Sequence, residues 1–194
     1  MIAPQTISQR LAASRLVGLL PAIEGALKPL FPDVTVRAHP GRIDVSDLIE
    51  KDIFLPPMIA VALTRWRGPV AVDGSWRIEV ECAAYIVTED MAVAGRAVPR
   101  QEVAHAIGHG LLDILADLDA PRWGLPAITS PERAEARPLF TSETFARGAA
   151  YYVVTWEQSL IGLGADPLAR VLVADPVLAA WDGGDEPVDE GGAA

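Results

Sequence analysis

Two histidines spaced four residues apart have the clearest potential for chemistry in this sequence. His105 and His109 lie within residues 100–118, whose apolar residues recur at helical spacing, so a helix there places both imidazoles on one face with Glu102 a turn earlier. Such a set can hold a metal ion, and a metal-dependent enzyme using these three residues is one candidate function. The full motif His-Glu-x-x-His is absent, however, and the histidines lie opposite the apolar stripe. We therefore favour a solvated helix face, and we assign no metal ligand, cofactor or catalytic residue.

A pair of carboxylates offers a second kind of chemistry. Glu79 and Glu81 alternate along residues 76–88, so a strand there projects both from one face. Paired carboxylates can act as general acid and base, but no nucleophile or further polar group is expected to converge on them. We favour a wet sheet face on which Arg77 and a neighbouring strand compensate the charge. Cys82 falls on the opposite, apolar face and is interpreted as a small core residue.

Long strands dominate the expected fold. The stretch Ala149–Ile161 is rich in β-branched and aromatic residues and contains no Gly or Pro. Its alternate positions form one apolar face, which includes Trp156, and one face that becomes polar in its second half. Residues 76–88 are predicted to pair with this strand. The apolar run 58–66 is predicted to be a buried strand that pairs antiparallel with 76–88 through a turn over residues 67–75.

The N-terminal part of the chain is predicted to be helical. Thr6 and Gln9 fit a capping box, and Pro21 should kink or split the helix that follows. Further predicted elements are strands at 34–38 and 138–140, a helical turn at 46–51, a helix at 100–118, and short helices starting at Asp166-Pro167 and Asp175-Pro176. Residues 89–99 and most of 120–147 are expected to be loops.

Together these elements predict an α+β domain over residues 1–161. Its sheet is mainly antiparallel or mixed, with four to five strands and with helices packed on one face. A short helical extension follows over residues 162–182. Residues 183–194 have the low hydrophobicity and high charge of an acidic disordered tail.

Composition narrows the function classes. The 194-residue chain has a net charge of −10, of which five acids in the last thirteen residues contribute half. The remaining body is also acidic, which argues against a nucleic-acid grip built on neutralising phosphates. The single cysteine rules out an intrachain disulfide. We expect no signal peptide and no membrane span, because the most apolar stretch, 159–181, is interrupted by charged residues and prolines.

The order of these pieces resembles the phage Mu-like tail terminator family of small phage tail proteins. None of the resembling segments is a chemical motif, so the resemblance rests on order and spacing over residues 35 to 161. The segments are 37–42, 58–63, 83–88, 102–118, 122–124 and 154–158.

This resemblance implies a structural virion protein and names no catalytic residue. It implies a homohexameric ring that caps the head-proximal end of the tail tube, contacts the tube protein below and contacts a neck or connector protein above. In a contractile tail the sheath protein is a further implied partner. DNA would pass through the lumen without specific binding, and the ring would assemble in the host cytoplasm. Another head–tail connector or neck protein is the nearest alternative.

Strand length is compatible with such an assembly. A thirteen-residue strand spans about 43 Å at about 3.3 Å per residue, well beyond the usual five or six residues. Part of Ala149–Ile161 is therefore expected to outrun its partners and to offer an edge to a neighbouring subunit. An acidic body would also repel DNA from a channel wall. The expected wet surface, facing solvent or a channel, consists of Thr155, Glu157, Ser159, Glu79 and Glu81.

Overall fold

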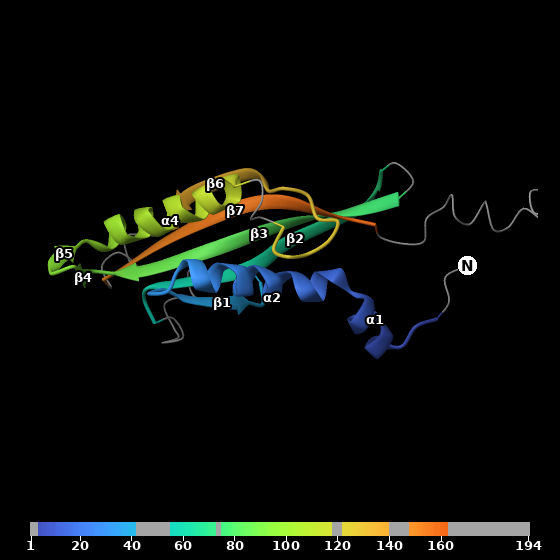
Figure 1. Ribbon diagram of the computed structural model, residues 1–194, viewed down its shortest axis with the longest axis horizontal. Helices are drawn as coiled ribbons and strands as arrows, with labels where there is room; N and C mark the ends of the chain where they lie inside the picture. Colours follow the sequence, from blue (N-terminus) through green and yellow to red (C-terminus); the bar gives the residue numbers. More distant parts are fainter. Residues whose placement is uncertain (1–3, 42–54, 73–74, 118–121, 140–147, 163–194) are drawn as a thin grey trace, which may run out of the picture.

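The computed structural model describes residues 4–41, 55–72, 75–117, 122–139 and 148–162 (Figure 1). Within these ranges the chain is α+β, as predicted, with a mixed five-stranded sheet in the order β1-β2-β3-β7-β6. The strands of the sheet are β1 (Thr35–His39), β2 (Met58–Val72), β3 (Ser75–Glu89), β6 (Glu132–Pro138) and β7 (Ala149–Ile161). The other elements are α1 (Ile7–Ala13), α2 (Arg15–Leu27), a 3-10 turn η1 (Lys28–Leu30), α4 (Arg100–Ala116), and a hairpin of β4 (Met91–Val93) with β5 (Arg96–Val98).

Strand β3 is the centre of the sheet. It pairs antiparallel with β2 on one side and with β7 on the other, and the register with β7 runs from Arg77 opposite Ile161 to Glu89 opposite Ala149. Among the described strands, β1 and β2 are the one parallel pair. The predicted strand at 149–161, its pairing with 76–88 and the antiparallel pairing of 58–66 with 76–88 are therefore confirmed.

The outer edge of β7 is covered along most of its length, which contradicts the expectation that β7 outruns its partners. Strand β6 pairs with it from Tyr152 to Glu157. The Leu139 amide donates to the Tyr151 carbonyl at one end, and Ile128 bridges to Leu160 at the other. The expectation fails because β6 and residues 127–129 pair with this edge although they carry little apolar pattern.

In the described part of the chain, β2 has an open edge of its own, in addition to the outer edges of the end strands β1 and β6. β1 is only five residues long and pairs with β2 between Met58 and Ala62. Beyond Ala62, no described strand lies against the outer edge of β2. We call residues 64–72 of β2 and 75–81 of β3 the distal pair. Figure 1 shows this pair continuing past α4 toward the end of the molecule where β7 also ends.

The distal pair contains two bulges, the second of which lies in the segment predicted to be a turn. The β2–β3 register shifts between Leu63 and Arg65 and again between Arg67 and Val70. Gly68 has a φ of +124°, and a Cβ on it would lie 2.9 Å from the Arg77 carbonyl oxygen, so the second bulge requires glycine. The prediction of a turn over 67–75 is therefore wrong for residues 67–72, which continue the strand. Residues 73–74 lie outside the described part.

Helices α2 and α4 pack side by side on one face of the sheet and form the main core. Helix α2 lies over β1 and β2, and α4 lies over β3 and β7. The predicted placement of helices on one face and of Cys82 in the core is confirmed. The fully buried core residues include Leu19, Ile23, Leu27, Ile59, Val61, Cys82, Ala84, Ile86, Leu111, Val154, Trp156 and Leu160.

A polar side chain lies inside this core. Gln158 is only 2% exposed. Its Oε1 accepts hydrogen bonds from the indole N–H groups of Trp123 (2.8 Å) and Trp156 (3.0 Å). Its Nε2 donates to the Thr129 carbonyl at 2.8 Å. The amide thus makes three hydrogen bonds, and it ties the segment after α4 to β7.

The opposite face of the sheet is divided into two parts. Its near part is a second buried apolar cluster, and its distal part is charged. The face of β7 thus becomes polar at Thr155, as the alternation predicted. The buried cluster consists of Met58, Ala60, Ala62, Ala83, Tyr85, Val87, Ala149, Tyr151 and Val153.

The N-terminal helix breaks at a different residue from the one expected. The capping box of Thr6 and Gln9 is confirmed, but the break falls at Ser14, whose backbone is extended, and Pro21 lies inside α2. Pro21 is tolerated because it and Val17, whose carbonyl loses the hydrogen bond, are both on the exposed side. None of the described helices combines the length and apolarity needed to cross a membrane.

Two other predicted segments need correction, and several lie outside the described residues. Residues 89–99 form the β4–β5 hairpin rather than a loop, and the strand expected at 138–140 is β6, at 132–138. Every residue of β6 is exposed, so its sequence lacks the alternation that identifies a strand. The helical turn at 46–51, the helices at 166 and 175, and the tail lie outside the described residues.

Candidate assembly surface

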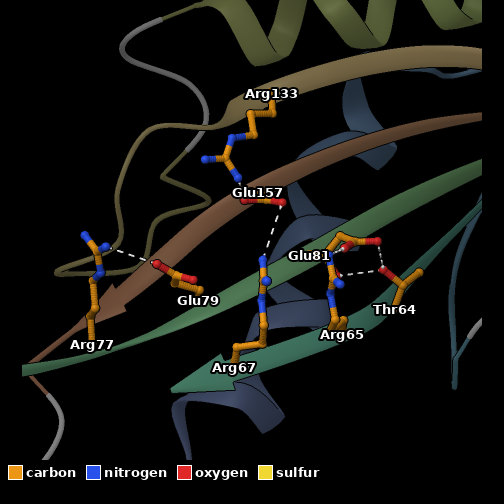
Figure 2. A network of polar contacts seen from close by, with 8 residues as sticks. All are labelled: Thr64, Arg65, Arg67, Arg77, Glu79, Glu81, Arg133 and Glu157. Carbon is orange, nitrogen blue, oxygen red and sulfur yellow. Dashed lines mark hydrogen bonds and ion pairs between the residues drawn. The ribbon is translucent and has the colours of Figure 1, made fainter. Parts of the chain in front are cut away.

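The outward face of the distal pair carries alternating arginines and glutamates, drawn in Figure 2. We call it the charged ladder, and it consists of Arg65, Arg67, Arg77, Glu79, Glu81, Arg133 and Glu157. Glu81 and Glu157 lie directly opposite each other in the β3–β7 register. Like charges in that position are destabilising unless they are compensated.

Arginines from three strands supply the compensation. Glu81 forms an ion pair with Arg65 of β2 and accepts a hydrogen bond from Thr64 Oγ1 at 2.9 Å. Glu157 accepts a hydrogen bond from Arg133 of β6 at 2.7 Å, with Arg67 of β2 3.8 Å away. The first bulge matters here, because it brings Arg65 opposite Glu81 and Arg67 opposite Glu79.

The remaining carboxylate of the ladder pairs along its own strand. Arg77 Nη2 lies 3.0 Å from Glu79 Oε1. The interpretation that Arg77 and a neighbouring strand compensate this face is confirmed in its geometry. Glu79 and Glu81 each have a basic partner, so they do not form an isolated carboxylate pair of the kind that supports acid–base catalysis.

The ladder is balanced in charge rather than acidic. It holds four arginines and three glutamates, with side chains between about a quarter and three quarters exposed. Ion pairs this exposed contribute only about 0–1 kcal/mol each. The acidic channel wall inferred from net charge therefore gains no support from this face, because its carboxylates are paired with arginines.

The other face of the distal pair is apolar and exposed. Trp66 is 61% exposed and Trp76 is 41% exposed. Trp66 lies opposite Val80, and Trp76 lies opposite Ala71. Because residues opposite each other in an antiparallel pair share a face, both tryptophans project on the side that carries the helices. We call this surface the tryptophan face.

Sequence reasoning missed the tryptophan face. Residues 58–66 were expected to form one buried strand, yet burial ends near Leu63 and Trp66 is exposed. The signal was the charge flanking Trp66: Arg65 and Arg67 cannot both be accommodated in a strand buried on two faces.

The candidate metal ligands each have a different partner. Glu102 pairs with Arg96 at 2.9 Å, and His109 lies 3.4 Å from Asp113. His105 Nε2 lies 3.0 Å from the Tyr152 hydroxyl, and the two rings meet edge to face. Within the described ranges, no group of three or more metal-ligating side chains comes together. The helical placement of these residues is confirmed, but the arrangement gives a metal-dependent enzyme no support.

Cys82 is fully buried in the helix-side core. Burial, together with the nearby charge of Glu81, raises the pKa of its thiol to about 12. The thiolate needed for nucleophilic chemistry is therefore disfavoured at neutral pH.

No protein-family model matches the chain, and no curated protein matches it significantly. The resemblance to tail terminators stays a prediction. The surface of the distal pair is the structural feature from which a function can be proposed.

Proposed function

We propose that the protein is a structural subunit of a phage or phage-like tail, a tail terminator that forms a ring at the head-proximal end of the tail tube. The observation that carries this proposal is the open edge of β2 beyond Ala62, which continues to Val72 beside exposed tryptophans. The proposed ring is a homohexamer, following the family resemblance.

An open strand edge of this length can bind a strand or loop of another chain, because its N–H and C=O groups are unpaired. Two bulges and Pro69 interrupt this edge, and Arg65 and Arg67 carry charge beside it, so a partner would pair with the short segments between them. A contact between this edge and a different surface of the next subunit is head-to-tail, and such contacts close into rings when the rotation allows.

The mechanism we propose is steric and geometric. One side of the ring would match the end of the tube and bind its last subunits. The other side would present a surface to which the tube protein cannot add, and a neck or connector protein would bind there. The charged ladder suits a wall that DNA passes without binding, because arginines already paired with glutamates are poor partners for phosphate.

Assembly with purified tube protein tests this function. Electron microscopy should show rings at one end of the tubes, and the tube length should stop increasing when the protein is added. Tubes that continue to grow at both ends in the presence of excess protein would contradict termination.

A charge on the open edge tests the surface itself. We expect Val70→Lys to keep the fold and to reduce ring formation at least tenfold, because a lysine on an edge strand opposes pairing with another chain. Val93→Lys is the matched control, since Val93 is 47% exposed in β4, at the opposite end of the molecule in Figure 1. Equal assembly by the two variants would exclude the β2 edge as the contact.

A further inference from the structure

We propose that residues 163–181 of the same chain dock on the tryptophan face. This inference is independent of the tail function, because it concerns what covers an apolar surface within one subunit. It rests on three observations: the exposure of Trp66 and Trp76, the place where the described chain ends, and the composition of the residues that follow.

The tryptophan face is a continuous apolar strip. Trp66 lies opposite Val80, Trp76 lies opposite Ala71, and Ile78 lies between them on β3. Ile78 and Val80 reach the main core, so the strip extends the core outward without a break. Two large aromatic side chains at the end of such a strip lose contact with water when a partner covers them, which stabilises the covered state.

The described chain ends at this strip. The Gly162 amide donates to the Trp76 carbonyl at 3.1 Å, so the described chain ends beside Trp76. A segment tethered at this point has an effective concentration on the order of millimolar at the strip. A second copy of the chain reaches that concentration only in concentrated solution, which favours the segment from the same chain.

The segment has the composition and length to cover the strip. Thirteen of the nineteen residues in 163–181 are Ala, Val, Leu or Trp, and only Asp166, Arg170 and Asp175 are charged. Trp66 and Trp76 are four residue positions apart along β3, about 13 Å. Nineteen residues reach about 28 Å even when fully helical. The acids of 182–194 follow only after the apolar part.

Photo-crosslinking in the full-length protein tests the docking. A benzophenone amino acid placed at position 66 should, after irradiation, join mainly to residues 163–181 within a monomer, as shown by peptide mapping. The same amino acid at Val93 is the control and should give no crosslink to 163–181. Crosslinks found in covalent dimers, crosslinks to another region, or a yield equal to the control would each overturn the proposal.

A paired substitution makes the test specific for apolar contact. In the position-66 protein, Leu168→Asp with Leu172→Asp should lower the crosslink yield at least fivefold, whereas Asp166→Asn should leave it unchanged. An unchanged yield in the double variant would show that proximity at the tether, rather than docking, produces the crosslink. Tube-termination assays on the same proteins report on the tail function separately, because they do not depend on the crosslink.

Discussion

The near and distal halves of the β2–β3 pair belong to one antiparallel strand pair but have opposite surroundings. In the near half, residues 58–63 lie opposite 82–87 without a bulge, and all of them except Leu63 are buried. In the distal half, one face carries the charged ladder and the other carries Trp66 and Trp76. The same strand pair is therefore core at one end and surface at the other.

Side-chain size follows this division. The near half uses alanines at four positions: Ala84 faces the helices, and Ala60, Ala62 and Ala83 lie on the opposite face, in the cluster that contains Tyr85 and Tyr151. The distal half instead uses arginine, glutamate and tryptophan. Since buried apolar area is the main source of stability, the near half holds the fold together. The distal half contributes less buried area, so its side chains are available to bind a partner.

The largest effect is expected from a charge buried beside the near half, on the neighbouring strand β7. Val154 is fully buried opposite Ala84, and we expect Val154→Asp to abolish folding, because an unpaired buried carboxylate costs more than about 4 kcal/mol. Circular dichroism and size-exclusion chromatography measure this. Val93→Asp, on exposed β4, is the control and should leave both unchanged. A folded Val154→Asp protein would mean that the core has been placed wrongly.

Removing the buried amide should produce a smaller loss. Gln158→Leu leaves the indole N–H groups of Trp123 and Trp156 without their acceptor. We expect the free energy of unfolding to fall by about 2–4 kcal/mol, since each unsatisfied buried donor costs about 1–3 kcal/mol. Urea denaturation checks the value. Gln101→Leu on the first turn of α4 should change it by less than about 0.5 kcal/mol.

Much of the near half could be predicted from sequence. The bounds of Ala149–Ile161 match β7 because its β-branched and aromatic run has no Gly or Pro and is bounded by Gly148 and Gly162. Alternation in 76–88 likewise indicated which residues of β3 face the helices. These signals are strong because burial acts on every second residue of a strand that lies in the core.

The distal half was predicted less well, because its structure depends on pairing with neighbouring strands rather than on the local sequence pattern. Gly68-Pro69 is typical of a turn, but the strand continues through it as a bulge. Strand β6 is exposed throughout, and backbone pairing with β7 forms it. Sequence indicated that the charge of Glu79 and Glu81 would be compensated. Arg65, Arg67 and Arg133 could be assigned to the ladder only once the register was known.

A charge reversal in the distal half should spare the fold. Glu157→Lys loses the ion pairs with Arg67 and Arg133 but places a cation opposite Glu81. We expect the free energy of unfolding to change by less than about 1 kcal/mol, with any larger effect confined to ring formation. Urea denaturation and light scattering measure the two. Glu157→Gln separates loss of the pairs from reversal, and unfolding of the Lys variant would mean that the two faces are assigned the wrong way round.

Thiol reactivity measures the difference in accessibility between the two halves, and it requires the smallest change to the protein. Burial raises the pKa of Cys82 from 9.0 to about 12, so the folded protein should not react with an aromatic disulfide reagent at pH 8. Because the folded pKa is the higher one, this group favours the folded state below pH 9, and its contribution falls as the pH rises from 9 toward 12. A cysteine introduced by Val70→Cys, on the exposed distal pair, should react within minutes in a Cys82→Ala background. Rapid reaction of Cys82 in the folded protein would show that the near half opens as readily as the distal half, and the division between the two would then fail.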